Sequence, residues 1–145
     1  MSRFFLLLLL APPLGASPDD DQKHPEEIAL VRKLYEEARS GNGGEILVKY
    51  ADRSLKEAFA AEARFHESTD SICIDADPVW ESQDPITDVK VEVRALRNGK
   101  IRASFEQYGR VDIDYTVNCA GGRCRISDLE TDGDHGLKDR LLHCE

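Results

Sequence analysis

The chain has 145 residues, a formal net charge of −9 and four cysteines. A chain of this length forms one domain with one modest core. Its acidic balance argues against nucleic acid and anionic membranes as partners, because both would repel it. Cations, basic proteins and neutral small molecules remain open as partners.

The N-terminal residues have the layout of a secretory signal peptide. One arginine precedes an apolar run at residues 4–10, and a Pro12-Pro13 pair follows. Cleavage is expected after Ala16. The apolar run is much shorter than the roughly 20 residues that a membrane-spanning helix needs. We therefore expect a periplasmic or secreted protein, with no stable membrane insertion after the signal peptide (residues 1–16) is removed.

A first amphipathic helix is predicted after a polar segment. Residues 17–24 have no apolar period, so we expect a flexible leader there and a single domain over residues 25–145. Pro25 suits the first turn of a helix, and a glycine-rich stretch at residues 40–44 ends it. The apolar positions of this helix recur at helical spacing: Ile28, Val31, Leu34, Tyr35 and Ala38.

The middle of the chain passes from a helical period to a strand period. A second apolar stripe begins at Leu55, and either Asp52 or Ser54 could cap a helix there. We expect both helices to pack one face on a sheet. From Thr87 the period changes to two through three successive runs, and a fourth run, CRISDLE, begins at Cys124. This alternation predicts a four-stranded antiparallel meander with one buried face, and hence an α+β fold.

The strand registers follow from keeping the apolar side chains on one face of the sheet. A three-residue loop at residues 97–99 opposes Ala95 to Ile101. The same reasoning for the next turn opposes Phe105 to Ile113.

The four cysteines predict two disulfides, because the number is even and the chain is expected to be exported. Cys119 lies opposite Cys124 in the last hairpin, and opposed Cα atoms lie about 4.5–5.5 Å apart, within the range of a disulfide. Cys73 and Cys144 then pair by elimination. A zinc site is disfavoured, because these two cysteines lie far in sequence from the hairpin pair.

Short motifs stand between the second helix and the first long strand. They are Leu55-Lys56 at the helix start, Asp75 to Pro78, and Gln83-Asp84. With these motifs and the closing CRISDLE strand, the chain resembles a family of small bacterial exported proteins and lipoproteins of unknown function. That resemblance spans residues 26–130. It implies the α+β cone called cystatin-like or nuclear-transport-factor-like, with two helices on a bent four-stranded sheet, and it implies no catalytic residues.

An acidic stretch follows the last predicted strand. Five carboxylates occupy positions 1, 3, 5, 7 and 12 of an EF-type calcium loop: Asp128, Glu130, Asp132, Asp134 and Asp139. Gly133 stands at position 6. Glutamate at position 3, aspartate at position 12 and the preceding strand all depart from such a loop. A solvated acidic turn is therefore the simpler interpretation, and a weak calcium site over residues 128–139 is the alternative.

Two further groups of side chains are candidates for a functional site. Extending the hairpin register places Asp128 opposite Tyr115 on the inner face, where a carboxylate and a phenol could perform acid–base chemistry. Mutual hydrogen bonding of two buried groups is the simpler interpretation. A ligand or partner surface is offered by the loop before the sheet, at Asp75, Asp77, Trp80, Gln83 and Asp84. We predict a non-catalytic exported domain that binds a small ligand or a protein through this loop or the cone hollow, with an enzyme in the hollow as the alternative.

Overall fold

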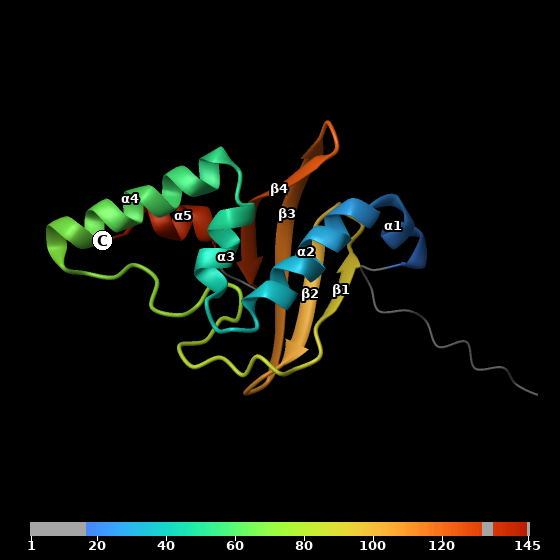
Figure 1. The fold of residues 1–145 in the computed structure, drawn as a ribbon, viewed down its shortest axis with the longest axis horizontal. Helices are drawn as coiled ribbons and strands as arrows, with labels where there is room; N and C mark the ends of the chain where they lie inside the picture. The colour runs from blue at the N-terminus through green and yellow to red at the C-terminus, as the bar shows by residue number, and fades with distance from the viewer. Residues whose placement is uncertain (1–16, 132–134, 145) are drawn as a thin grey trace, which may run out of the picture.

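The computed structural model describes residues 17–131 and 135–144, which form five helices and a four-stranded antiparallel sheet (Figure 1). The helices are α1 (Pro18–Lys23), α2 (Pro25–Ala38), α3 (Gly43–Tyr50), α4 (Arg53–Thr69) and α5 (Leu137–Leu142). The strands, in sheet order, are β1 (Glu92–Ala95), β2 (Ile101–Glu106), β3 (Arg110–Ala120) and β4 (Arg123–Thr131). The α+β class is confirmed. The expected signal peptide lies outside the described residues. Within them, no helix is long and apolar enough to cross a membrane.

Helix α2 lies across one face of the sheet and contacts all four strands (Figure 1). Its buried residues are those of the predicted stripe: Ile28, Val31, Leu34, Tyr35 and Ala38. Alternate sheet residues face it and are also buried: Val93, Ala95, Ile101, Ala103, Phe105, Ile113 and Tyr115. Each fully buried valine, isoleucine or phenylalanine side chain among them contributes about 1.5–3 kcal/mol of transfer free energy. The core therefore lies between α2 and the sheet.

The first hairpin has the predicted register. Ala95 lies opposite Ile101. The amide of Leu96 donates to the carbonyl of Lys100, which closes the three-residue loop, and Gly99 takes the positive φ of 82° that this loop requires.

The predicted register of the second hairpin is wrong by two residues. Phe105 lies opposite Val111, not Ile113. The turn is shorter than expected because Tyr108 takes a positive φ and the amide of Gln107 bonds to the carbonyl two residues later. The Gln107 side chain turns into the core, where it bonds to backbone groups of the segment before β1. A shift of two residues keeps every side chain on its own face, so the burial pattern could not reveal it.

Two helices form where sequence reasoning expected none. The segment expected to be a flexible leader forms α1, because Ser17 caps it and Pro18 suits its first turn. The Asp21 carboxylate accepts a hydrogen bond from the amide of Ala95, which joins α1 to β1. Helix α3 follows the glycine-rich stretch, and Leu47 is one of its buried apolar residues. These helices have six and eight residues, too few for a helical period to be recognised.

Helix α4 differs from the expectation that it packs on the sheet face. It begins at Arg53 with Asp52 as its cap, as one of the two predicted alternatives. The helix then runs beside β4 and away from the sheet, with α5 alongside it (Figure 1). It buries only Leu55 and Ala58. Ala51, just before it, forms a parallel bridge with Ile126 and so covers the edge of β4.

Both predicted disulfides are present. Cys73–Cys144 joins residues 71 positions apart, with its Cα atoms 5.3 Å from each other. Cys119–Cys124 joins residues five positions apart in the β3–β4 hairpin, with its Cα atoms 4.0 Å from each other. The first bond holds the end of the chain, just after α5, against the segment that follows α4. In the chain-entropy model it constrains the unfolded chain more than the hairpin bond does.

Candidate functional site

The space between α2 and the sheet is filled by aromatic side chains. Trp80 enters from the loop before β1, and its ring lies 5.2 Å from Tyr35 and 5.3 Å from Phe105, edge to face. Tyr115 lies 6.2 Å from Tyr35 in the same manner. All four rings are buried. Side chains thus occupy the region where sequence reasoning expected a hollow.

The two buried phenols hydrogen-bond to each other. The Tyr35 hydroxyl lies 3.0 Å from the Val79 carbonyl and 2.9 Å from the Tyr115 hydroxyl. Because a hydroxyl has one proton and a carbonyl can only accept, Tyr35 donates to Val79 and Tyr115 donates to Tyr35. Burial raises the pKa of both phenols well above its usual value. Both hydroxyls therefore stay neutral and act as structural groups.

Asp128 does not meet Tyr115, and the predicted opposition of the two is wrong. A register shift between Thr116 and Val117 places Leu129 opposite Tyr115 and Asp128 opposite Thr116. Opposed residues share a face of the sheet, so Asp128 lies on the side away from the phenols. Its carboxylate instead accepts the amide of Lys138 at 3.0 Å, in the first turn of α5. This contact gives Asp128 a partner at the start of that helix.

The predicted partner loop divides into a buried part and an exposed part. Trp80 is completely buried and donates its indole N–H to the Ala38 carbonyl, so it presents no surface to a partner. Asp77 is half-buried, and its carboxylate accepts the amides of Gly43 and Val79 at 2.8 and 2.9 Å. Burial raises the Asp77 pKa, and these amide hydrogen bonds oppose the rise.

The remaining loop residues are at the surface. Asp75, Gln83 and Asp84 are exposed, and the Gln83 amide donates to the Asp75 carboxylate. Their role as a partner surface stays a prediction. A Cβ on Gly43 would overlap the Asp77 carboxylate, so glycine at this position permits the contact that docks α3.

The candidate calcium stretch is only partly described. Asp132 and Asp134 lie outside the described residues. Among the other carboxylates, Asp128 contacts α5, Glu130 pairs with Lys100 across the sheet, and Asp139 contacts His143, the residue just after α5. The described carboxylates of this stretch form no common ligand cluster. Calcium binding here stays a prediction.

A surface that sequence reasoning missed lies between the helices and the tip of the β3–β4 hairpin. Two open grooves, of about 510 and 410 Å³, share Arg125 as a wall. One runs along the start of α4 and the other along the first half of α2. We call the combined surface the basic groove and define it by Lys33, Lys56, Arg123 and Arg125. Leu30 and several alanines supply its apolar wall: Ala29, Ala51 and Ala60.

The basic groove carries more positive charge than its acidic residues neutralise. The two grooves are lined by five cationic side chains and by three carboxylates, those of Glu26, Asp52 and Glu57. Asp52 is engaged as the cap of α4, Glu57 pairs with Arg53 at 2.8 Å, and Glu26 lies beside Cys124. Lys56 and Arg123 form no ion pair with any described residue. Thus a local cationic surface stands on a chain whose net charge is −9.

The other cations of the groove are held by neutral groups. The Arg125 guanidinium donates to the neighbouring Cys124 carbonyl at 3.0 Å, which holds it beside the hairpin. The Lys33 ammonium lies 5.9 Å from the centre of the Tyr50 ring. Neither contact neutralises the charge, so both cations remain available to an anion.

The groove could not be read from residue spacing, because its cations come from three separate segments of the chain. The one local signal is the RCR sequence at residues 123–125, which places an arginine on each side of a disulfide-bonded cysteine.

Comparison with known proteins identifies a shared fold. No protein-family model matches the chain, and no curated protein matches it. A crystal structure of a protein of unknown function from Bacteroides thetaiotaomicron VPI-5482, at 2.10 Å resolution, is similar with a TM-score of 0.56. The two chains are 22% identical, and the match covers 77% of this chain and 94% of that one. At this identity the similarity concerns the fold alone.

Proposed function

We propose that this protein is an exported, non-catalytic domain that binds a small amphipathic anion in the basic groove. The observation that carries the proposal is a pair of adjoining apolar-walled grooves on an acidic chain, one lined by Lys56 and the other by Arg123, with Arg125 lining both. Arginine and lysine bind carboxylate, sulfonate or phosphate groups through charge-assisted hydrogen bonds. The wall formed by Leu30 and the alanines would take the apolar body of the ligand.

A binding function is favoured over catalysis because the polar side chains of the interior hydrogen-bond to other protein groups. The Tyr115 phenol, which the sequence offered for acid–base chemistry, hydrogen-bonds to Tyr35, and Asp128 contacts α5 instead. Two disulfides support the proposal of export, because such bonds persist in oxidising compartments. The helix-on-sheet architecture supports the proposed relation to exported proteins with the cystatin-like cone.

Fluorescence titration with the anionic dye 1-anilinonaphthalene-8-sulfonate, displaced by decanoate, tests this proposal. We expect saturable dye binding that weakens with salt, because surface charges are screened. Arg125→Ala should weaken decanoate binding about tenfold or more, since a hydrogen bond to a charged group contributes about 1.5–3 kcal/mol. Arg97→Ala is the matched control, because Arg97 is exposed in the β1–β2 turn and the substitution removes the same charge.

The competing ligand has its own control. Decyltrimethylammonium has the same apolar tail as decanoate but the opposite charge, so it should displace the dye poorly. Equal displacement by both amphiphiles, or equal losses in the Arg125 and Arg97 variants, would show that the basic groove is not an anion site.

A further inference from the structure

The Cys119–Cys124 disulfide stands at the end of the basic groove, where Cys124 forms part of the wall. Its two cysteines are directly opposed in the hairpin, and the tip residues beyond them are exposed. An external thiol can therefore reach this bond from the groove. The ladder pairs on both sides of it, Ala120 with Arg123 and Asn118 with Arg125, would hold the strands together after reduction.

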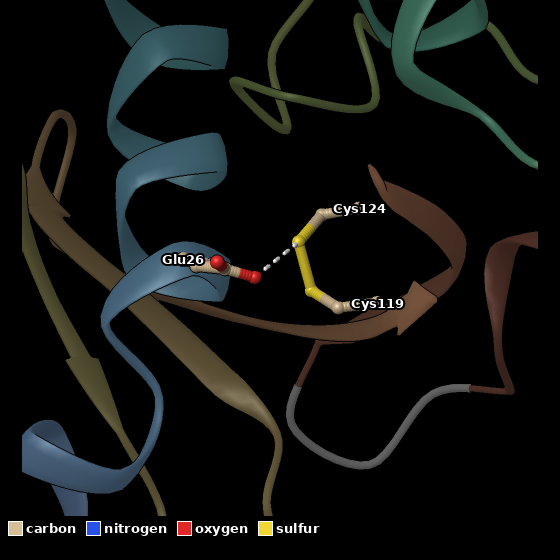
Figure 2. A group of neighbouring side chains, drawn as sticks. All are labelled: Glu26, Cys119 and Cys124. Atoms are coloured by element: carbon tan, nitrogen blue, oxygen red, sulfur yellow. Dashed lines mark hydrogen bonds between the residues drawn. A yellow bond between two sulfur atoms is a disulfide. The ribbon is translucent and has the colours of Figure 1, made fainter. Parts of the chain in front are cut away.

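A carboxylate lies beside this disulfide. Glu26, in the first turn of α2, places Oε2 3.9 Å from the Sγ atom of Cys124 (Figure 2). A disulfide sulfur carries no proton, so this contact is not a hydrogen bond while the cysteines are joined. The carboxylate oxygen and the two sulfur atoms all lie within 4.8 Å of one another. Among the described residues, no other group of three acidic, histidine or cysteine side chains is close enough to share a metal ion.

These separations fit a soft metal ion once the sulfur–sulfur bond is broken. Zinc binds thiolates at about 2.3 Å and carboxylates at about 2.0–2.2 Å, so a tetrahedral site needs sulfur–oxygen and sulfur–sulfur separations of about 3.5–3.8 Å. The separation of Glu26 Oε2 from Cys124 Sγ is already close to that value. The sulfurs reach theirs when the side chains of Cys119 and Cys124 rotate apart.

We propose that the reduced hairpin is a metal site, in which Cys119, Cys124 and Glu26 bind a divalent zinc-like cation. A dithiol reductant first transfers two electrons and two protons to the disulfide, gives two thiols and becomes a disulfide itself. Metal binding then displaces both thiol protons. Three protein ligands leave a fourth position open for water or for a ligand in the groove.

The surrounding charges favour this assembly. Two thiolates and a carboxylate carry three negative charges, of which the divalent cation neutralises two. Arg123 and Arg125, which flank Cys124 in sequence, line the same groove as Cys124 and Glu26 and would offset part of the negative charge that remains. Arginines near a cysteine also favour its thiolate form, which is the form that binds metal. The proposed site does not depend on anion binding, so either proposal can fail alone.

The first part of the test asks which disulfide yields to a dithiol. The folded, oxidised protein is treated with graded dithiothreitol without oxygen, free thiols are alkylated, and the labelled cysteines are identified by mass spectrometry. We expect Cys119 and Cys124 to be labelled before Cys73 and Cys144, while circular dichroism shows that the fold is retained. If the hairpin bond is reduced only when the protein unfolds, the proposal is overturned.

The second part measures zinc. The selectively reduced protein competes for zinc against a chromophoric chelator, and we expect one equivalent bound. Loss of an outer-shell partner typically weakens metal affinity 10- to 100-fold, so Glu26→Gln, which removes a direct ligand, should weaken it at least about tenfold. Glu36→Gln, an exposed position on the same helix, is the matched control with the same charge change and should bind as the parent does.

A background without the other thiols keeps the result unambiguous. The Cys73→Ser/Cys144→Ser protein retains only the hairpin pair and should bind one equivalent of zinc after reduction. If this variant does not fold, the selectively reduced parent protein supplies the answer. Absence of zinc binding, or equal affinity in the Glu26 and Glu36 variants, would overturn the three-ligand site.

Discussion

Replacing Tyr35 with phenylalanine should destabilise the protein far more than the same change at Tyr115. The Tyr35 hydroxyl donates to the Val79 carbonyl and accepts from the Tyr115 hydroxyl, and both tyrosines are buried. Removing it leaves a carbonyl and a hydroxyl without this partner in the core. Removing the Tyr115 hydroxyl leaves Tyr35 still donating to Val79.

The expected loss of stability in each variant follows from the number of buried polar groups that are left without a hydrogen-bond partner. A buried polar group left without its partner costs about 1–3 kcal/mol. Tyr35→Phe should therefore lower the free energy of unfolding by about 2–6 kcal/mol, whereas Tyr115→Phe should lower it by about 1 kcal/mol, the typical worth of one hydrogen bond. In the double variant the stranded Tyr115 hydroxyl is gone, so the double variant should be more stable than Tyr35→Phe alone by about 1 kcal/mol or more.

Urea unfolding followed by far-ultraviolet circular dichroism measures all three variants under identical conditions. Tyr108→Phe is the matched control, because the Tyr108 side chain is exposed and its loss should change stability by less than about 0.5 kcal/mol. A double variant less stable than Tyr35→Phe would refute the assigned direction of the hydrogen bonds. Equal losses in the two single variants would do the same.

Two further predictions concern the Asp77 carboxylate and the two buried phenols. Asp77→Asn should lower the free energy of unfolding by about 1–3 kcal/mol, because one of the two backbone amides that donate to Asp77, such as that of Gly43, would face the amide nitrogen of asparagine. Thermal melts measure this loss. Asp75→Asn, at an exposed position, is the control and should change stability little. Alkaline pH should destabilise the protein as well. Burial holds the pKa of both core tyrosines above the unfolded value of about 10, so the unfolded state loses protons first and stability falls as pH rises past that value. From pH 10 to 11 the two together should cost about 2 kcal/mol, measured by urea midpoints, and the Tyr35→Phe/Tyr115→Phe protein should lose this contribution.

Where buried side chains recur at a regular spacing, the sequence alone was enough to predict the helix or strand and its buried face. The apolar stripe of α2 and the apolar–polar alternation of the strands each indicate which side chains are buried on folding. The hairpin disulfide was predictable because the strand register brings Cys119 opposite Cys124, and the second disulfide then followed from counting.

Features that leave this period unchanged, or that interrupt it at a single residue, escaped prediction. The two-residue shift between β2 and β3 keeps each side chain on its face. The one-residue shift between Thr116 and Val117 comes late in a strand, and Asp128 then turns toward α5 and away from Tyr115. Helix α3 is docked by a contact between Asp77 and Gly43, residues 34 positions apart.

Composition and spacing by themselves determined the α+β class, the face that α2 buries, the alternation of buried and exposed residues in most of the sheet, and the disulfide pairing. Those properties follow from local periodicity and from the opposition of neighbouring strands. Only the tertiary structure decided which surface could bind. The cations of the basic groove come from α2, α4 and β4. Glu26 lies 98 positions from Cys124 in the sequence. Such groups come together because the core packs those elements against one another, and no regular spacing in the sequence indicates that they will be neighbours.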